Sequence, residues 1–164
     1  MAGSISPSRP GNNFSRLGGG PMAFSQKVKD LIFNAHRDHC VCMLGTVGED
    51  GPNISPKGSM IVYDDDHLAY WERSKRSALD NLRKNPRVVV MYSNKAAAEA
   101  GDLEYPGGIL RFYGTAEIYE RGDLRDKIRT MLQPREIDHE GAEEGFAVLI
   151  KLDRAVDIRG NSIR

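Results

Sequence analysis

The stretch "CVCMLGTVGEDGPNISPKGSMIVYDDDHLAYWER", residues 40–73, decides the fold because it contains three extended segments joined by tight turns. "GEDG", at 48–51, has the composition of a hairpin turn, and "DDD", at 64–66, forms a second turn. The segments between and around these turns are apolar and β-branched, or they alternate in polarity, as strands do. The predicted strands are 40–47, 53–63 and 67–73.

Three more strands follow along the chain. "RVVVMYS", residues 87–93, is apolar on both faces, which predicts a strand that is buried on both sides. "GILRFYGTAEIYE", residues 108–120, alternates between apolar and polar side chains, and the last strand covers 145–158. Residues 94–107 are predicted to be a loop with a helical turn. Helices are predicted at about 25–36 with Ser25 as the N-cap, at about 77–84, and at about 122–132. Six antiparallel strands with short flanking helices predict a mainly β fold, a small closed barrel.

The composition indicates one soluble domain. Residues 1–22 are rich in Gly, Ser, Pro and Asn and predict a flexible N-terminal tail, which leaves 23–164 as the folded domain. Lys plus Arg number 23 and Asp plus Glu number 23, and this balance argues against a nucleic-acid binder. No apolar run is long enough to span a membrane. The two cysteines, Cys40 and Cys42, are predicted to be reduced thiols, which fits a cytoplasmic protein.

A local cluster of positive charge precedes the helix at 77–84. Arg73, Lys75 and Arg76 lie within four residues, and Ser77 after them is a good N-cap. Cations are unfavourable beside the positive end of a helix dipole unless an anion lies among them. Cations, a hydroxyl group and the free N–H groups of a first helical turn describe a phosphate site. The alternative is that these cations belong to a solvated loop.

A polar stripe follows the strand predicted at 53–63. Period-two alternation places Ser55, Lys57 and Ser59 on one face. Pro56 and Gly58 flank the lysine and weaken strand pairing, so the backbone is expected to bend here or to approach another group closely. The stripe is either a second ligand-contact surface or a solvent-exposed face.

"HRDHCVC", residues 36–42, concentrates His36, His39, Cys40 and Cys42 in one short segment. Such residues are soft ligands for zinc or contacts for haem, but their spacing matches no standard zinc pattern and no second ligand pair follows. A change from helix to strand within the segment also scatters the side chains. We interpret them as a cysteine pair of the strand with surface histidines and predict no metal site.

The order of these motifs resembles the pyridoxamine 5′-phosphate oxidase-like family, the FMN-binding split β-barrels. The resemblance covers about residues 25–158 and is carried by "SPKG", by "NLRKNPRV" at the junction of helix and strand, and by "RFYGTAEI". It implies a six-stranded split barrel that forms a homodimer, with one FMN at each of two sites along the interface. It implies contacts to the flavin from Ser55, Lys57 and Ser59, and contacts to the phosphate from Arg73, Lys75, Arg76 and Ser77. Arg111 would reach the flavin of the partner subunit.

Two departures from the family pattern limit the expected activity. Ser77 and Ala78 stand where the classical oxidase has an Arg-Lys pair, and the chain ends without that oxidase's Arg/His-containing segment. We therefore expect a flavin-dependent oxidoreductase that acts on an unidentified small molecule rather than on the phosphorylated vitamin. The alternatives are a non-catalytic FMN or haem binding or sensing protein and a deazaflavin-dependent reductase. No residue pattern identifies the electron donor.

Overall fold

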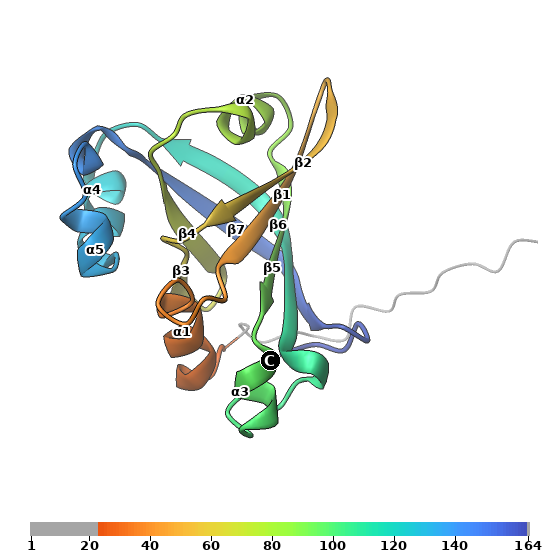
Figure 1. Cartoon of the computed structure of the whole chain (residues 1–164). Coiled ribbons are helices and arrows are strands. Elements are labelled where there is room, and N and C mark those ends of the chain that lie inside the picture. The colour runs from red at the N-terminus through yellow and green to blue at the C-terminus, as the bar shows by residue number, and fades with distance from the viewer. Residues whose placement is uncertain (1–22, 164) are drawn as a thin grey trace, which may run out of the picture.

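A computed structural model describes residues 23–163, so the predicted tail at 1–22 lies outside the described residues. The strands are β1 (Cys42–Gly48), β2 (Gly51–Lys57), β3 (Ile61–Asp64), β4 (His67–Glu72), β5 (Arg87–Ser93), β6 (Ile109–Tyr119) and β7 (Phe146–Asp157). The helices are α1 (Gln26–Phe33), α2 (Ser77–Lys84), α3 (Lys95–Glu99), α4 (Asp123–Met131) and α5 (Pro134–Ile137), with short 3-10 turns η1 (Pro106–Gly108) and η2 (Ala142–Glu144). Figure 1 shows α2 over one end of the strands, with α1 and α3 at the opposite end.

The strands form one antiparallel sheet in the order β2-β1-β5-β6-β7-β4-β3. Its two edge strands, β2 and β3, are consecutive in the chain, and only residues 58–60 separate them. Because so short a link joins opposite edges, the sheet must curl until the edges meet. The result is a barrel that is split between β2 and β3 (Figure 1). The predicted mainly β split barrel is confirmed, with seven strands in place of six.

The extra strand arises because the segment expected as one strand at 53–63 is broken. β2 ends at Lys57 and pairs with β1, whereas β3 begins at Ile61 and pairs with β4. Pro56 has no N–H to give to a ladder, and a Cβ on Gly58 would lie 3.1 Å from Cδ2 of His36. The close approach predicted at this segment is present at Gly58, whereas β2 stays paired with β1 through Pro56 and Lys57, so the break between β2 and β3 falls at residues 58–60.

Side chains, rather than a continuous ladder, hold the two sides of the split together. The pairing of β3 with β4 ends at Ile61 and Ala69, before the end of β4. Beyond that point Ser59 Oγ accepts a hydrogen bond from the Trp71 N–H at 3.0 Å and donates one to the Trp71 carbonyl oxygen at 3.2 Å. Lys57 Nζ donates to Glu72 Oε2 at 2.5 Å. The hydroxyl of Ser59 thus substitutes for a missing strand neighbour.

The barrel interior is the main core, and α4 packs a smaller apolar cluster against the outside of β4. Interior side chains come from most strands and include Leu44, Val90, Tyr92, Phe112 and Ile150. The smaller cluster includes Trp71, Ile128 and Leu132. Among the described residues, no helix is both long and apolar enough to cross a membrane.

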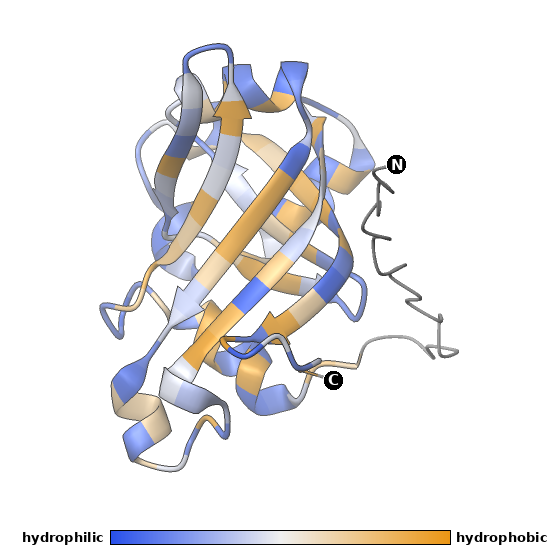
Figure 2. Cartoon of the chain, turned by 90° about the vertical axis from the view of Figure 1, so that its right-hand side faces the viewer, coloured by the Kyte–Doolittle hydropathy of each residue, from blue (hydrophilic) through white to orange (hydrophobic). Residues whose placement is uncertain are grey.

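One face of β5 departs from the sequence prediction. The strand has the predicted bounds and buries Val88, Val90 and Tyr92, but its other face carries the half-buried Val89 and the exposed Met91. The prediction of burial on both sides is wrong for the single chain, because no other part of the described chain covers this face. Figure 2 shows long apolar segments, in orange, along the strands of the sheet.

We predict that Ser59→Ala lowers the free energy of unfolding of the apoprotein by about 1–3 kcal/mol, because the Trp71 N–H and carbonyl at the split both lose their partner. Urea unfolding measures the change. Ser55→Ala is the matched control, since Ser55 Oγ accepts only from the side chain of Asn53, and its effect is expected to be smaller. Equal losses for the two variants would show that Ser59 does not hold the split.

Candidate functional site

A hollow of about 570 Å³ opens at the split of the barrel. One wall is formed by the β2–β3 turn, the end of β4 and residues 73–76, which we call the cationic turn. The opposite wall comes from α5, η2 and the residues between them. Residues 56–59 and 71–75 line the first wall, and Glu136, His139, Glu140, Gly141 and Glu144 line the second.

The structure brings some of the predicted site residues together at this hollow and leaves others apart. Lys57, Ser59, Arg73 and Lys75 line it. Ser55 is half-buried farther along β2, and Arg76 and Ser77 are exposed at the start of α2, just beyond the lining residues. Arg111 is elsewhere: it lines an apolar hollow on the outward face of the sheet.

A carboxylate of the chain itself lies inside the cationic turn. Besides the bond from Lys57, Glu72 accepts hydrogen bonds on Oε1 from the Ser74 hydroxyl at 2.8 Å, the Ser74 N–H at 3.1 Å and the Lys75 N–H at 3.4 Å. Burial raises the pKa of this carboxyl, but the bond and charge of Lys57, with the bonds from Ser74 and Lys75, outweigh it and hold the pKa below its ordinary value. Lys57, a predicted flavin contact, is thus committed to Glu72, with its ammonium 4.9 Å from the centre of the Tyr70 ring.

Arg73 is committed to the opposite wall. Its Nε lies 3.3 Å from Oε2 of Glu136, whose side chain is 1% exposed. Arg135 donates to the other oxygen of Glu136 and also contacts His36. Arg73 therefore fastens the segment after α4 across the hollow, a role that its position in a charge run did not reveal.

The remaining cations differ in how free they are. Lys75 has a backbone φ of 48°, and its ammonium lies 4.1 Å from the centre of the Phe146 ring. Arg76 is exposed, and within the described residues it forms no ion pair. The prediction that Ser77 is the N-cap is wrong: Arg76 is the N-cap, without a side-chain cap bond, and Ser77 is the first helical residue. The N–H groups of Ser77 and Ala78 therefore have no acceptor within the helix.

The comparisons with known proteins agree with this architecture. The sequence model described as pyridoxamine 5'-phosphate oxidase matches residues 26–149. The chain belongs to this family. No curated protein sequence matches it.

Solved structures of similar fold include HupZ of Group A Streptococcus, as a histidine-to-alanine variant, with 25% identity and a TM-score of 0.63 over 83% of this chain and 100% of that one. A putative pyridoxamine 5'-phosphate oxidase from Lactobacillus delbrueckii has 26% identity and a TM-score of 0.56 over 76% of this chain and 88% of that one. An FMN-binding protein from Syntrophomonas wolfei has 13% identity and a TM-score of 0.58 over 81% and 87%, which shows the shared fold alone.

The sequence analysis did not predict the residues that form the second wall of the hollow. His139, Glu140 and Glu144 are exposed and face the cationic turn across the hollow. The only signal for them is the acidic stretch "EIDHEGAEE", which follows the predicted helix and has no periodicity. Nothing local in the sequence indicates that this stretch returns to Arg73.

The histidines and cysteines of residues 36–42 take separate positions. His36 contacts Arg135, Cys40 Sγ donates to the Asp38 carbonyl at 3.3 Å, and Cys42 is fully buried, which raises the pKa of its thiol to about 12. Across residues 23–163, no group of three or more His, Cys, Asp or Glu side chains is arranged to hold a metal ion. These residues do not form a common site.

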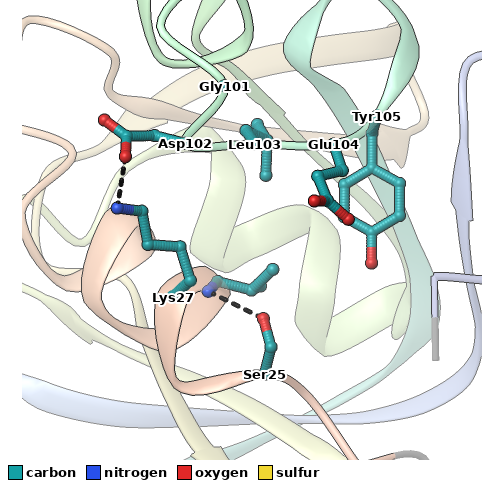
Figure 3. Close-up of a pocket in the computed structure, with 8 residues that line it drawn as sticks. Ser25, Lys27, Gly101, Asp102, Leu103, Glu104 and Tyr105 are labelled. Carbon is teal, nitrogen blue, oxygen red and sulfur yellow. Dashed lines mark hydrogen bonds and ion pairs between the residues drawn. The ribbon is translucent and has the colours of Figure 1, made fainter.

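Figure 3 shows a second hollow, of about 500 Å³, between the start of α1 and residues 101–105. Its lysine, Lys27, pairs with Asp102 at 2.5 Å, and Ser25 Oγ accepts from the Val28 N–H as the predicted N-cap. Because Glu104 adds a further negative charge, this hollow is poorly suited to a phosphate. The hollow at the split is the better candidate site.

The low pKa of Glu72 predicts an acid-dependent loss of stability. A carboxyl whose pKa is lower in the folded than in the unfolded protein stabilises the fold above its ordinary pKa of about 4.5, and this contribution is lost as the pH falls through the lower, folded value. At pH 7, Glu72→Gln should lower the free energy of unfolding by about 3 kcal/mol or more, because Lys57 is left without its counter-charge. The measurement is urea unfolding of both proteins between pH 3 and about pH 7. A difference that stays constant down to pH 3 would contradict the pairing.

Proposed function

We propose that this protein binds FMN at the split of the barrel, with the phosphate at Arg76, Ser77 and the first turn of α2. The observation that carries the proposal is the start of α2, where Arg76 has no ion pair with any described residue and N–H groups lack a helical acceptor, directly after the residues that line a hollow of about 570 Å³. Helix N-termini with adjacent cations bind phosphate through charge-assisted hydrogen bonds. Membership of the pyridoxamine 5'-phosphate oxidase family and the fold shared with an FMN-binding protein support this ligand.

The residues around the hollow fit such a ligand. The β2 strand, with Ser55 and Pro56, and the turn at Gly58 offer polar groups and a low wall for a flat ring system. Arg73 and Lys75 add positive potential without being free to move fully onto the phosphate. Ser55, Lys57, Ser59, Arg73, Lys75, Arg76, Ser77 and Arg111 stay predictions as cofactor contacts.

We further propose that the protein is an FMN-dependent oxidoreductase that acts on a small molecule. FMN supplies two-electron chemistry when it is bound, and the chain supplies binding, orientation and charge. The substrate side of the hollow is the acidic wall, where His139 and Glu140 are exposed and can contact a bound molecule. The two free cysteines, Cys40 and Cys42, support a cytoplasmic location.

We also propose a homodimer that buries the outward face of the sheet. This face holds an apolar hollow of about 460 Å³, and Ile54 is 70% and Met91 40% exposed. An exposed apolar patch of this kind on a small domain marks an interaction surface. Arg111 lines this hollow, and its guanidinium donates hydrogen bonds to the carbonyl oxygens of Asp157 and Ile158. The chain therefore holds the guanidinium in place, and from this position it would contact a ligand of the partner subunit.

The proposed cofactor is tested by identifying what co-purifies with the protein. Mass spectrometry and the absorption spectrum distinguish FMN from a deazaflavin or haem. Anaerobic addition of NADH or NADPH then separates an oxidoreductase, whose flavin bleaches, from a passive binder, whose flavin does not. An apoprotein that fails to take up added FMN would overturn the proposal.

Arg76→Ala is predicted to weaken FMN binding about tenfold or more, because a charge-assisted hydrogen bond to the phosphate is lost. Riboflavin, which lacks the phosphate, should bind equally to both proteins, and the unfolding free energy of the apoprotein should not fall. Arg73→Ala should instead destabilise the apoprotein, since the buried Glu136 loses a partner. Fluorescence titration and urea unfolding make the measurements.

The control for this pair is Arg83→Ala, which removes an exposed arginine from the other end of α2, where it pairs with Glu120. It should leave FMN affinity unchanged. If Arg76→Ala behaved like this control, the cationic turn would be a solvated loop.

Ile54→Asp is predicted to convert the dimer to a monomer, because it places a charge in the middle of the apolar face. Size-exclusion chromatography with light scattering measures the mass. Ala96→Asp on α3 adds the same charge at an exposed position outside the residues that line the apolar hollow and should leave the dimer intact. A wild-type protein that is a monomer at micromolar concentration with FMN bound would refute the dimer.

A further inference from the structure

The cationic turn is organised around Glu72, and this arrangement limits where a ligand can bind. The carboxylate is 2% exposed, and each of its oxygens accepts from the surrounding chain: Oε2 from Lys57, and Oε1 from Ser74 and Lys75. The donors on the inner side of the turn are therefore already taken by an anion. A phosphate that approaches from the hollow meets occupied N–H groups there.

The same carboxylate compensates for backbone strain in the turn. Lys75 adopts a left-handed conformation with φ of 48°, which is strained for a residue with a Cβ. Its N–H points to Glu72, and its side chain lies over Phe146. The helix α2 begins two residues after this left-handed position, at Ser77.

Two of the three cations of the turn are held by other side chains. Arg73 is held by Glu136 and Lys75 by the ring of Phe146, whereas Arg76 has no ion pair within the described part of the chain. Glu72 lines the hollow, whereas Arg76 and Ser77 are exposed and are not among its lining residues. The internal anion is thus on the hollow side of the turn, which we call the inner side, and Arg76 and Ser77 lie outside the lining residues.

We propose that Glu72 is a positioning residue for the phosphate: its carboxylate occupies the inner side of the turn and holds Lys75 left-handed, so that Arg76 and Ser77 are presented outward to the ligand. This inference rests on the proposed binding of FMN and names the residue that shapes its phosphate site. Glu72 itself does not touch the ligand. The opposite role, in which Glu72 competes with the phosphate for the same donors, predicts that its removal strengthens binding.

A single substitution of Lys57 or Glu72 is difficult to interpret, because removing either residue leaves the other as an uncompensated buried charge. Neutral replacement of both members of a buried ion pair is commonly tolerated. We therefore compare Lys57→Met/Glu72→Gln with Lys57→Met/Glu72→Leu. Both double variants lack the ion pair, but only the first retains a side-chain oxygen that can accept from Ser74 and Lys75.

The proposal predicts that the Leu double variant binds FMN about tenfold more weakly, or worse, than the Gln double variant, because both carry Lys57→Met and they differ only in the acceptor at position 72. Riboflavin affinity should be nearly the same for the two, because riboflavin lacks the group that uses the turn. A merely structural role of Glu72 would change the affinities for both flavins together. Stronger FMN binding by the Leu double variant would establish competition and overturn the proposal.

Amide hydrogen exchange of the apoproteins supplies a readout that does not depend on FMN. The amides of Ser74 and Lys75 should be protected in the wild type and in the Gln double variant and should exchange faster in the Leu double variant. Equal exchange in all three would overturn the proposal, even if no flavin binds. If exchange changes as expected but the wild type binds neither flavin, the positioning of the turn stands and the proposed cofactor fails.

Glu143→Gln is the matched control for charge. It removes one negative charge from an exposed residue near the acidic wall that does not line the hollow, and no hydrogen bond joins its side chain to another described residue. FMN affinity should stay the same or rise slightly, and exchange at Ser74 and Lys75 should not change. A loss of FMN affinity as large as that of the Leu double variant would show that charge, rather than position, is the cause.

Discussion

The short link between β2 and β3 is the constraint on which the rest of the structure depends. It joins the two edges of the sheet and leaves no room for a strand ladder between them, so β4 beyond Ala69 has a backbone edge without a neighbour. Buried backbone groups must find partners, and here Ser59 supplies both a donor and an acceptor to Trp71. A barrel closed in this way needs polar side chains at its split, and those side chains make the split a place where a polar ligand can bind.

The charge run before α2 carries less free charge than its sequence implies. Arg73 of this run pairs with the buried carboxylate of Glu136, and the buried Glu72 next to it is paired with Lys57 of β2. Such pairs contribute little net stability, because each charge loses its hydration on burial, but removing one member leaves the other uncompensated. Their effect is to fix geometry: one carboxylate holds the turn, and the other holds the segment after α4 across the hollow.

The sequence predicted the elements whose signals are local and missed the contacts that depend on closure of the barrel. The bounds of α2 and β5 follow from periodicity within each segment, and they agree with the structure. The stripe of Ser55, Lys57 and Ser59 was also found, but the same spacing fits a ligand surface and an internal hydrogen-bond set. Only the chain path shows that Ser59 and Lys57 meet the end of β4. The exposed face of β5 is a similar case. An apolar pattern predicts that a surface is covered, but it does not identify the element that covers it.

The arrangement also explains why three cations can precede a helix N-terminus without an external ligand. The dipole of α2 and the turn place positive charge together, yet Arg73 pairs with Glu136, the Lys75 N–H donates to Glu72, and the Lys75 ammonium lies against the Phe146 ring. Within the described residues, Arg76 is the cation of the turn that no side chain holds, and with the two N–H groups that lack a helical acceptor it suits one phosphate rather than a broad polyanion. The ligand that we propose, a discrete anion with an attached flat ring, would place its anion at this helix start and its ring in the hollow at the split.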